Sequence, residues 1–109
     1  MATTYKVLGQ VNPAAITPTT LYPCPAGTQT VISTITVCNQ AASSGTYRIS
    51  VRPNGAVQAP EHYLVYDATI PANSVTAYTL GITVDASDVV TVYASSTSMS
   101  FNAFGSEIA

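Results

Sequence analysis

Charged side chains are scarce in this sequence of 109 residues. Asp, Glu, Lys and Arg make up 7% of the chain, against a typical share of about 25%. Tryptophan is absent, and the strong helix formers Glu, Lys, Gln and Arg are few. Thr, Ser and Val are abundant instead, and Thr and Val suit the pleated surface of a sheet. The composition disfavours helices and predicts a protein built from β-strands.

The shortage of charge also argues against several classes of partner. Lys6, Arg48 and Arg52 are the only fixed cations, and the formal net charge is −2. A phosphate backbone needs a cluster of cations, so no nucleic-acid partner is expected. No apolar run approaches the length of about 18 residues that a membrane helix requires, so no membrane partner is expected either.

The first residues contain no apolar segment of the kind found in a secretory leader. We therefore expect the protein to be made in a cytoplasm and to remain there or leave by another route, such as release inside a virus particle. Cys24 and Cys38 then fit two reduced thiols, although a disulfide between them stays open.

Alternation of apolar and polar residues predicts the strands. Tyr47, Ile49 and Val51 share one face of the segment 46–52, which ends at the turn sequence Pro53-Asn54-Gly55. The same pattern predicts strands over residues 5–11, 20–24, 29–39, 62–70, 74–84, 89–94 and 98–104. Strands at this spacing predict an all-β fold, an antiparallel β-sandwich of seven to eight strands with jelly-roll or immunoglobulin-like connections. Residues 1–109 are expected to form one domain.

The alternation also predicts which residues of each strand share a face. We expect three such sets, and they are Val31, Ser33, Ile35 and Val37; Leu64, Tyr66, Ala68 and Ile70; and Tyr78, Leu80, Ile82 and Val84. Tyr47, Tyr66 and Tyr78 lie on apolar faces and are expected in the core, whereas Tyr63 and Tyr93 lie on the opposite faces.

Residues 1–20 read as an extended N-terminal arm and connector. Pro13 and Pro18 lack backbone donors, so the connector is not a central strand. The arm either contacts a neighbouring subunit or crosses over within its own domain. No charged residue occurs from Val7 to Tyr47 or from Val89 to Ser106. The core of a protein interface is depleted of charge in this way, so these strands are expected to contact a partner. The alternative is that Ser, Thr, Asn and Gln alone keep the strands soluble. The candidate interface residues are Tyr5, Val7, Tyr22, Tyr63 and Tyr93.

No motif predicts catalysis, a cofactor site or a metal site. The single histidine, His62, has no nucleophile motif near it in the sequence, and Cys24, Cys38 and His62 lack the close spacing of zinc ligands. Asp85 and Asp88 fit a turn better than a calcium loop. No catalytic, cofactor-binding or metal-binding residue is therefore predicted, and a small hydrolase is the least favoured hypothesis.

Two segments carry a resemblance to a known class of protein. They are LGITVDASDVVTVYA over residues 80–94 and SFNAFGSE over residues 100–107, and the opening YKVLGQ over residues 5–10 carries the same resemblance. The chain resembles small virion proteins of tailed bacteriophages, and among these the capsid decoration (cement) proteins. The resemblance implies no site residues, because such proteins act through surfaces.

The resemblance implies a non-enzymatic virion structural protein that binds and stabilises an assembled shell. Its partners would be the major capsid protein or other virion proteins, it would be a homo-oligomer with a trimer favoured, and it would be assembled in the host cytoplasm. The alternative is a tail, collar or fibre module that binds a host-surface glycan or receptor.

Overall fold

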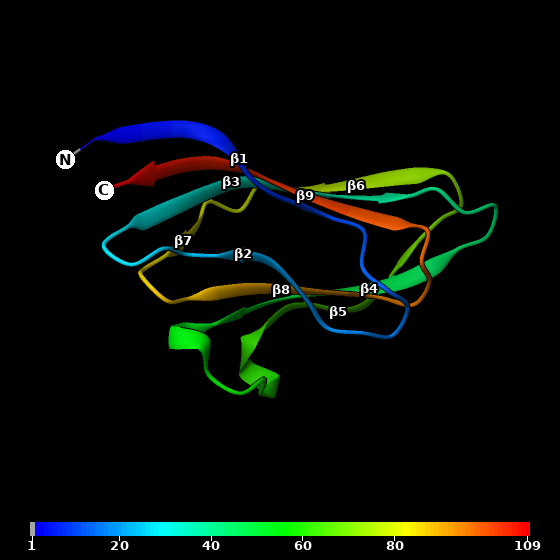
Figure 1. The fold of residues 1–109 in the computed structure, drawn as a ribbon. Helices are drawn as coiled ribbons and strands as arrows, with labels where there is room; N and C mark the ends of the chain where they lie inside the picture. Colours follow the sequence, from blue (N-terminus) through cyan, green and yellow to red (C-terminus); the bar gives the residue numbers. More distant parts are fainter. Residues whose placement is uncertain (1) are drawn as a thin grey trace.

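Two antiparallel sheets face each other in the computed structural model, which describes residues 2–109 (Figure 1). The described residues contain nine strands and two single-turn 3₁₀ helices. The strands are β1 (Thr3–Val11), β2 (Thr19–Pro23), β3 (Gln29–Asn39), β4 (Gly45–Arg52), β5 (Tyr63–Ile70), β6 (Ser74–Tyr78), β7 (Ile82–Val84), β8 (Val89–Ala94) and β9 (Met99–Ile108). One sheet has the order β1-β9-β3-β6 with β7 also on β3, and the other has the order β2-β8-β4-β5. The predicted β-sandwich is confirmed.

The strand pairs are nested along the chain. β1 pairs with β9, β2 with β8, β3 with β6 and β7, and β4 with β5, so the outermost strands in sequence pair and the innermost form a hairpin. A long antiparallel ribbon of paired strands has this nesting, and here successive pairs of the ribbon lie in alternate sheets. This arrangement is jelly-roll connectivity. Because β6 and β7 are two parts of one interrupted strand on β3, the count agrees with eight strands.

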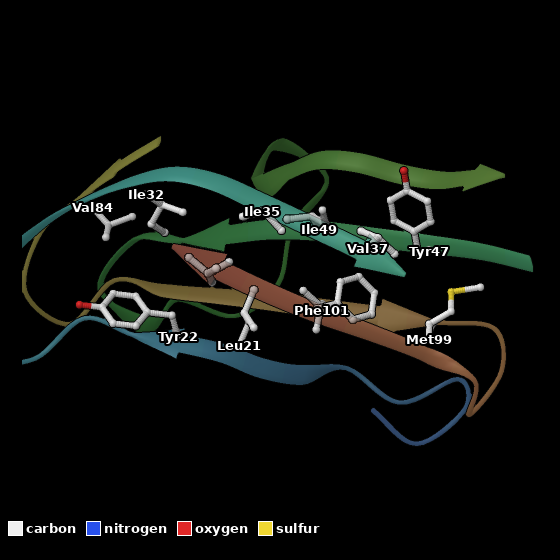
Figure 2. Close-up of a cluster of buried hydrophobic side chains, with 14 of the residues drawn as sticks. Leu21, Tyr22, Ile32, Ile35, Val37, Tyr47, Ile49, Val84, Met99 and Phe101 are labelled. Atoms are coloured by element: carbon white, nitrogen blue, oxygen red, sulfur yellow. The ribbon is translucent and has the colours of Figure 1, made fainter. Parts of the chain in front are cut away.

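The core fills the space between the sheets. The five-stranded sheet contributes Ile35, Val37 and Phe101, and the four-stranded sheet contributes Tyr47 and Ile49, all fully buried (Figure 2). The Tyr47 ring packs edge-on against Phe101 with centroids 6.3 Å apart, and its hydroxyl bonds that of Tyr78. Burial, reinforced by this bond, raises the pKa of Tyr47 to about 12. Tyr47 and Ile49 are buried and Val51 packs against the core, so the predicted face of 46–52 is confirmed.

A β-bulge at Ser33 makes the predicted face of β3 partly wrong. Ile32 pairs with Gly105 but Thr34 pairs with Phe104, so β3 has one extra residue at this point. A bulge reverses the alternation of side chains. Thr30 and Ile32 point inward before it and Ile35 and Val37 after it, whereas Val31 is only half-buried and Ser33 is exposed.

The expected face of β5 is wrong in its first half for the same reason. Asp67 has a positive φ of 50°, and β5 has an extra residue between the pairs Ala68–Tyr47 and Val65–Ile49. Leu64 and Tyr66 are therefore exposed, while Val65 is partly buried in the position expected for them.

The predicted strand 74–84 is broken. β6 ends at Tyr78 and β7 begins at Ile82, and Gly81 between them has a positive φ of 65°. Leu80 lies in this break and is exposed, although it was expected to share a face with Tyr78 and Ile82. Ile82 and Tyr78 both pack against the core, as predicted.

The N-terminal segment belongs to the sandwich. Residues 3–11 form the β1 edge of the five-stranded sheet, and residues 12–18 carry the chain across to β2 in the other sheet. A Cβ on Gly9 would lie 2.1 Å from the Leu21 carbonyl oxygen, so the second half of β1 lies directly against β2. The connector is thus a crossover between the two sheets of the sandwich. The first half of β1 projects beyond this contact (Figure 1).

Both cysteines are free thiols. Cys24 is buried, and its Sγ donates to the Thr28 carbonyl oxygen at 3.4 Å, while Cys38 is half-buried on β3. Of the two states left open by the sequence, the structure contains the reduced one. Within residues 2–109 there is no helix of the length and hydropathy needed to cross a membrane.

Candidate functional site

His62 has a structural partner. Its Nδ1 accepts a hydrogen bond from the Ala59 backbone N–H at 3.0 Å and closes the 3₁₀ turn Pro60–His62. With one ring nitrogen committed to the backbone in this turn, the histidine acts as a local cap on the loop between β4 and β5.

Asp85 and Asp88 shape the turn before β8. Asp88 accepts from the backbone N–H of Asp85 at 2.9 Å and from that of Asn54 at 2.8 Å, and Asp85 accepts from Ala86 N–H at 2.8 Å. The turn interpretation of both residues is confirmed. Among residues 2–109, no three His, Cys, Asp or Glu side chains gather in a way that could hold a metal ion.

The outer face of the five-stranded sheet contains no Asp, Glu, Lys or Arg among its described residues. The strand registers and the alternation of burial define this uncharged face. Its members include Thr3, Tyr5, Val7, Gln10, Gln29, Val31, Thr34, Thr36, Cys38, Val75, Ala77, Thr83, Ser100, Asn102, Phe104, Ser106 and Ile108. Solvated protein surfaces usually carry charges of both signs, so this face has the composition of a contact surface.

Apolar side chains gather on the uncharged face near the β1 edge. Tyr5 is 84% exposed and Val7 48%, and Val7 is the direct cross-strand partner of Phe104, which is 37% exposed. Val75, on β6 at the opposite edge, is 65% exposed. Tyr5 and Val7 are interface candidates predicted from the sequence, whereas Phe104 and Val75 were not predicted. The period-two pattern of β9, with Phe101 and Ala103 inward, places Phe104 outward and could have identified it.

Tyr22, a third interface candidate, lies inside the sandwich. Its side chain is buried, and its hydroxyl lies 2.6 Å from Glu107 Oε2 and 2.7 Å from Thr30 Oγ1. Glu107 also pairs with Lys6 at 3.1 Å between Nζ and Oε1. The hydrogen bond from Tyr22 and then that from Lys6 lower the pKa of Glu107, while burial and the bond to Glu107 raise the pKa of Tyr22. Tyr22 therefore joins the two sheets at the end of the molecule where the termini lie.

This cluster predicts an acid-sensitive contribution to stability. The folded-state pKa of Glu107 is depressed, so its contribution is present above its ordinary value of 4.5 and is lost as the pH falls through the folded-state pKa. Tyr22→Phe removes the largest cause of that depression and is expected to lower the free energy of unfolding at pH 7 by about 1.5–3 kcal/mol.

Urea denaturation of both proteins at pH 7 and pH 3 checks this. The difference between wild type and Tyr22→Phe should be smaller at pH 3, because below the ordinary pKa of 4.5 the unfolded chain gains a proton at Glu107 that the folded wild type resists. Tyr66→Phe is the matched control, because Tyr66 is exposed on the outer face of the same four-stranded sheet as Tyr22 and, within residues 2–109, has no contact with Glu107 among its hydrogen bonds. A difference that is the same at both pH values would contradict the assigned role of Glu107.

Tyr63 and Tyr93, the last two interface candidates, lie on the outer face of the four-stranded sheet. Tyr93 is the cross-strand partner of Arg48, whose guanidinium carbon lies 4.2 Å from the Tyr93 ring centroid and 4.3 Å from that of Tyr66. The Tyr63 and Tyr66 rings meet edge to face at 4.8 Å. The alternation of the sequence predicts Tyr66 in the core, but the bulge at Asp67 brings it into this exposed aromatic cluster.

Arg48 is held between the two rings by a carboxylate. Its Nε donates to Asp67 Oδ1 at 2.6 Å and its Nη2 to Asp67 Oδ2 at 3.2 Å. The hydrogen bonds raise the pKa of Arg48 and lower that of Asp67. Exposed ion pairs contribute little to stability, so the effect of this pair is chiefly to fix the orientation of the arginine. Stacked Arg and Tyr side chains are typical of binding hot spots.

A hollow of about 460 Å³ adjoins this cluster. It is lined by Gln58, Ala59, Pro60, Tyr63 and Tyr66. The loop beside it is fixed in place, since Ser50 Oγ donates to Gln58 Oε1 at 2.9 Å and Arg52 Nη1 donates to the Ala56 carbonyl oxygen at 3.0 Å. The four-stranded sheet thus presents an ordered aromatic surface, in contrast to the uncharged face of the other sheet.

Comparison of the chain with protein-family models and with curated proteins gives no match in either case.

Proposed function

We propose that the protein is a non-enzymatic structural component of a virion, a capsid decoration protein that binds and stabilises the assembled shell. The observation that carries this proposal is the uncharged face of the five-stranded sheet. It presents hydroxyl, amide and apolar groups, which lose little on transfer out of water compared with charged groups and can pack against a protein surface. Its partners are then the major capsid protein or other virion proteins, and assembly takes place in the host cytoplasm.

Self-association fits the same function. A decoration protein contacts several shell subunits at once, and simultaneous contacts raise the overall affinity far above that of each one. A homo-oligomer multiplies the uncharged face in this way, whereas a monomer presents it once.

The location of the protein in purified particles tests the proposal. Immunogold labelling and quantitative mass spectrometry should find many copies distributed over the capsid. A few copies at one end of the tail would instead support the second candidate, a tail, collar or fibre module that binds a host-surface glycan or receptor. The cluster of Tyr63, Tyr66, Tyr93 and Arg48 beside its hollow is the observation that favours this alternative.

A charge placed on the uncharged face tests the contact surface directly. Phe104→Asp would bury an unpaired carboxylate against the shell and is expected to weaken binding to undecorated particles by about tenfold or more. Val57→Asp is the matched control, because Val57 is 88% exposed on the loop of the other sheet. Co-sedimentation with particles measures both variants, and equal binding by Phe104→Asp and wild type would reject this face as the contact.

A further inference from the structure

The first half of β1 has a free hydrogen-bonding edge. Ala2 and Ala109 exchange both of their backbone hydrogen bonds, at 2.7 and 3.0 Å. In an antiparallel pair such residues alternate with residues whose peptide groups point away from the partner strand. From the β1–β9 register, Thr4 and Lys6 bond to β9, while Thr3, Tyr5 and Val7 direct their N–H and C=O groups outward. β1 ends the sheet order, so no strand of the same chain within residues 2–109 pairs with these groups.

The usual protections of an edge strand are weak here. Proteins blunt exposed edges with proline, lysine, bulges or a covering segment. β1 contains no proline, and its one lysine, Lys6, is bound to Glu107 on the inner side of the sheet. The bulge between Val7 and Gly9 and the cover supplied by β2 near Gly9 begin only where the segment 3–7 ends. The open edge is therefore confined to the first half of β1, which runs beside β9 (Figure 1).

We propose that this edge pairs with the same edge of a second copy, antiparallel and about a two-fold axis at Tyr5. In this register Tyr5 lies opposite Tyr5 of the second copy and Thr3 lies opposite Val7. All three residues that carry free peptide groups are then paired in both chains. The inference rests on the proposed function in one respect, which is that the protein self-associates.

Charge and side-chain pairing select this register. A shift that centres the axis on Lys6 would place two lysines directly opposite each other, whereas the Tyr5 register places Lys6 opposite Thr4. Residues directly opposite each other in a sheet share a face. The two tyrosines therefore meet on the outer side, and the uncharged faces of both copies join into one continuous surface. The backbone supplies affinity and the tyrosine pair supplies register, as in other cases of strand addition.

Analytical ultracentrifugation of the whole chain over a wide range of concentration tests the pairing. The expected mass at high concentration is twice that of the 11.3 kDa chain. Tyr5→Pro removes an outward N–H that β9 does not use, so it should leave the fold intact, as judged by circular dichroism, and return the mass to that of a monomer. Val57→Lys, on the exposed loop of the other sheet, should leave the dimer unchanged.

Cross-linking gives an independent readout in a chain carrying Cys24→Ser and Cys38→Ser. Tyr5→Cys in that chain should form a disulfide-linked dimer on oxidation, and the matched variant Thr4→Cys should not, because Thr4 lies opposite Lys6.

Four results would overturn the proposal. They are a wild-type monomer at every concentration, a trimer, a dimer that survives Tyr5→Pro, and cross-linking by both cysteine variants. A monomer or trimer that still decorates shells would overturn it while leaving the proposed function standing. A dimer that responds to the variants as expected but binds no particle would support the strand pairing and contradict the proposed function.

Discussion

Replacing Phe101 with alanine is expected to lower the free energy of unfolding by about 3–5 kcal/mol. The ring is fully buried on β9, between the two sheets, and packs edge-on against Tyr47 at 6.3 Å (Figure 2). β9 is bonded on one side to β1 and on the other to β3, so its backbone cannot move inward to fill the space. The cavity would persist, and its cost adds to the lost transfer free energy. Urea denaturation followed by circular dichroism measures the loss.

The only other phenylalanine is the matched control. Phe104 lies on the same strand and is 37% exposed on the opposite face, so Phe104→Ala is expected to cost less than about 1 kcal/mol. Similar losses for the two variants would mean that both faces of β9 are buried. That result would contradict both the register of the sheet and the exposure of the uncharged face.

Replacing Gly105 with alanine is expected to lower the free energy of unfolding by about 3 kcal/mol, although it adds only one methyl group. A Cβ at this position would lie 2.0 Å from the Val31 carbonyl oxygen and 3.0 Å from the Ile32 Cα. Both are backbone atoms of the neighbouring strand at the bulge of β3. Relief of the clash therefore requires β3 and β9 to separate, which strains their hydrogen bonds.

Ser106→Ala is the control for this variant. Ser106 follows Gly105 on the outer side of the sheet, and its substitution is expected to change the stability by less than about 0.5 kcal/mol. Thermal or urea denaturation compares the two. A Gly105→Ala variant as stable as the wild type, or stabilised through the reduced entropy of its unfolded chain, would contradict the close approach of the two strands.

The two sheets of the sandwich present very different surfaces. The charge-free stretches of the sequence are distributed over both sheets, as β2 and β8 in one and β3 and most of β9 in the other. Arg48 and Arg52 lie on β4, and Asp67 lies on β5, so the four-stranded sheet carries strand charges that the uncharged face lacks. The jelly-roll connectivity thus places these strand charges on the four-stranded sheet. The outer face of the five-stranded sheet is left without charge, which suits a protein contact.

Local sequence signals predicted most of the strands. β3 and β8 begin and end at the residues expected, and β4 differs from its expected range by a single residue. These strands have regular alternation and turn residues at their ends, and both depend only on neighbouring residues. The candidate surface was predicted in part, because the missing charges and the apolar β1 residues Tyr5 and Val7 are visible in the sequence.

Composition and local alternation are enough to predict an all-β sandwich with few charges and turns at identifiable positions. Pairing between strands far apart in the sequence is needed to bury Tyr22, to expose Tyr66 and to bring Phe104 beside Val7 on one face. The bulges at Ser33 and Asp67 each add one residue to a strand and reverse its alternation, and their positions depend on the partner strand. Likewise, Tyr22 is buried between the two sheets, and its hydroxyl bonds to Glu107, which is 85 residues further along the chain and lies on β9 in the opposite sheet.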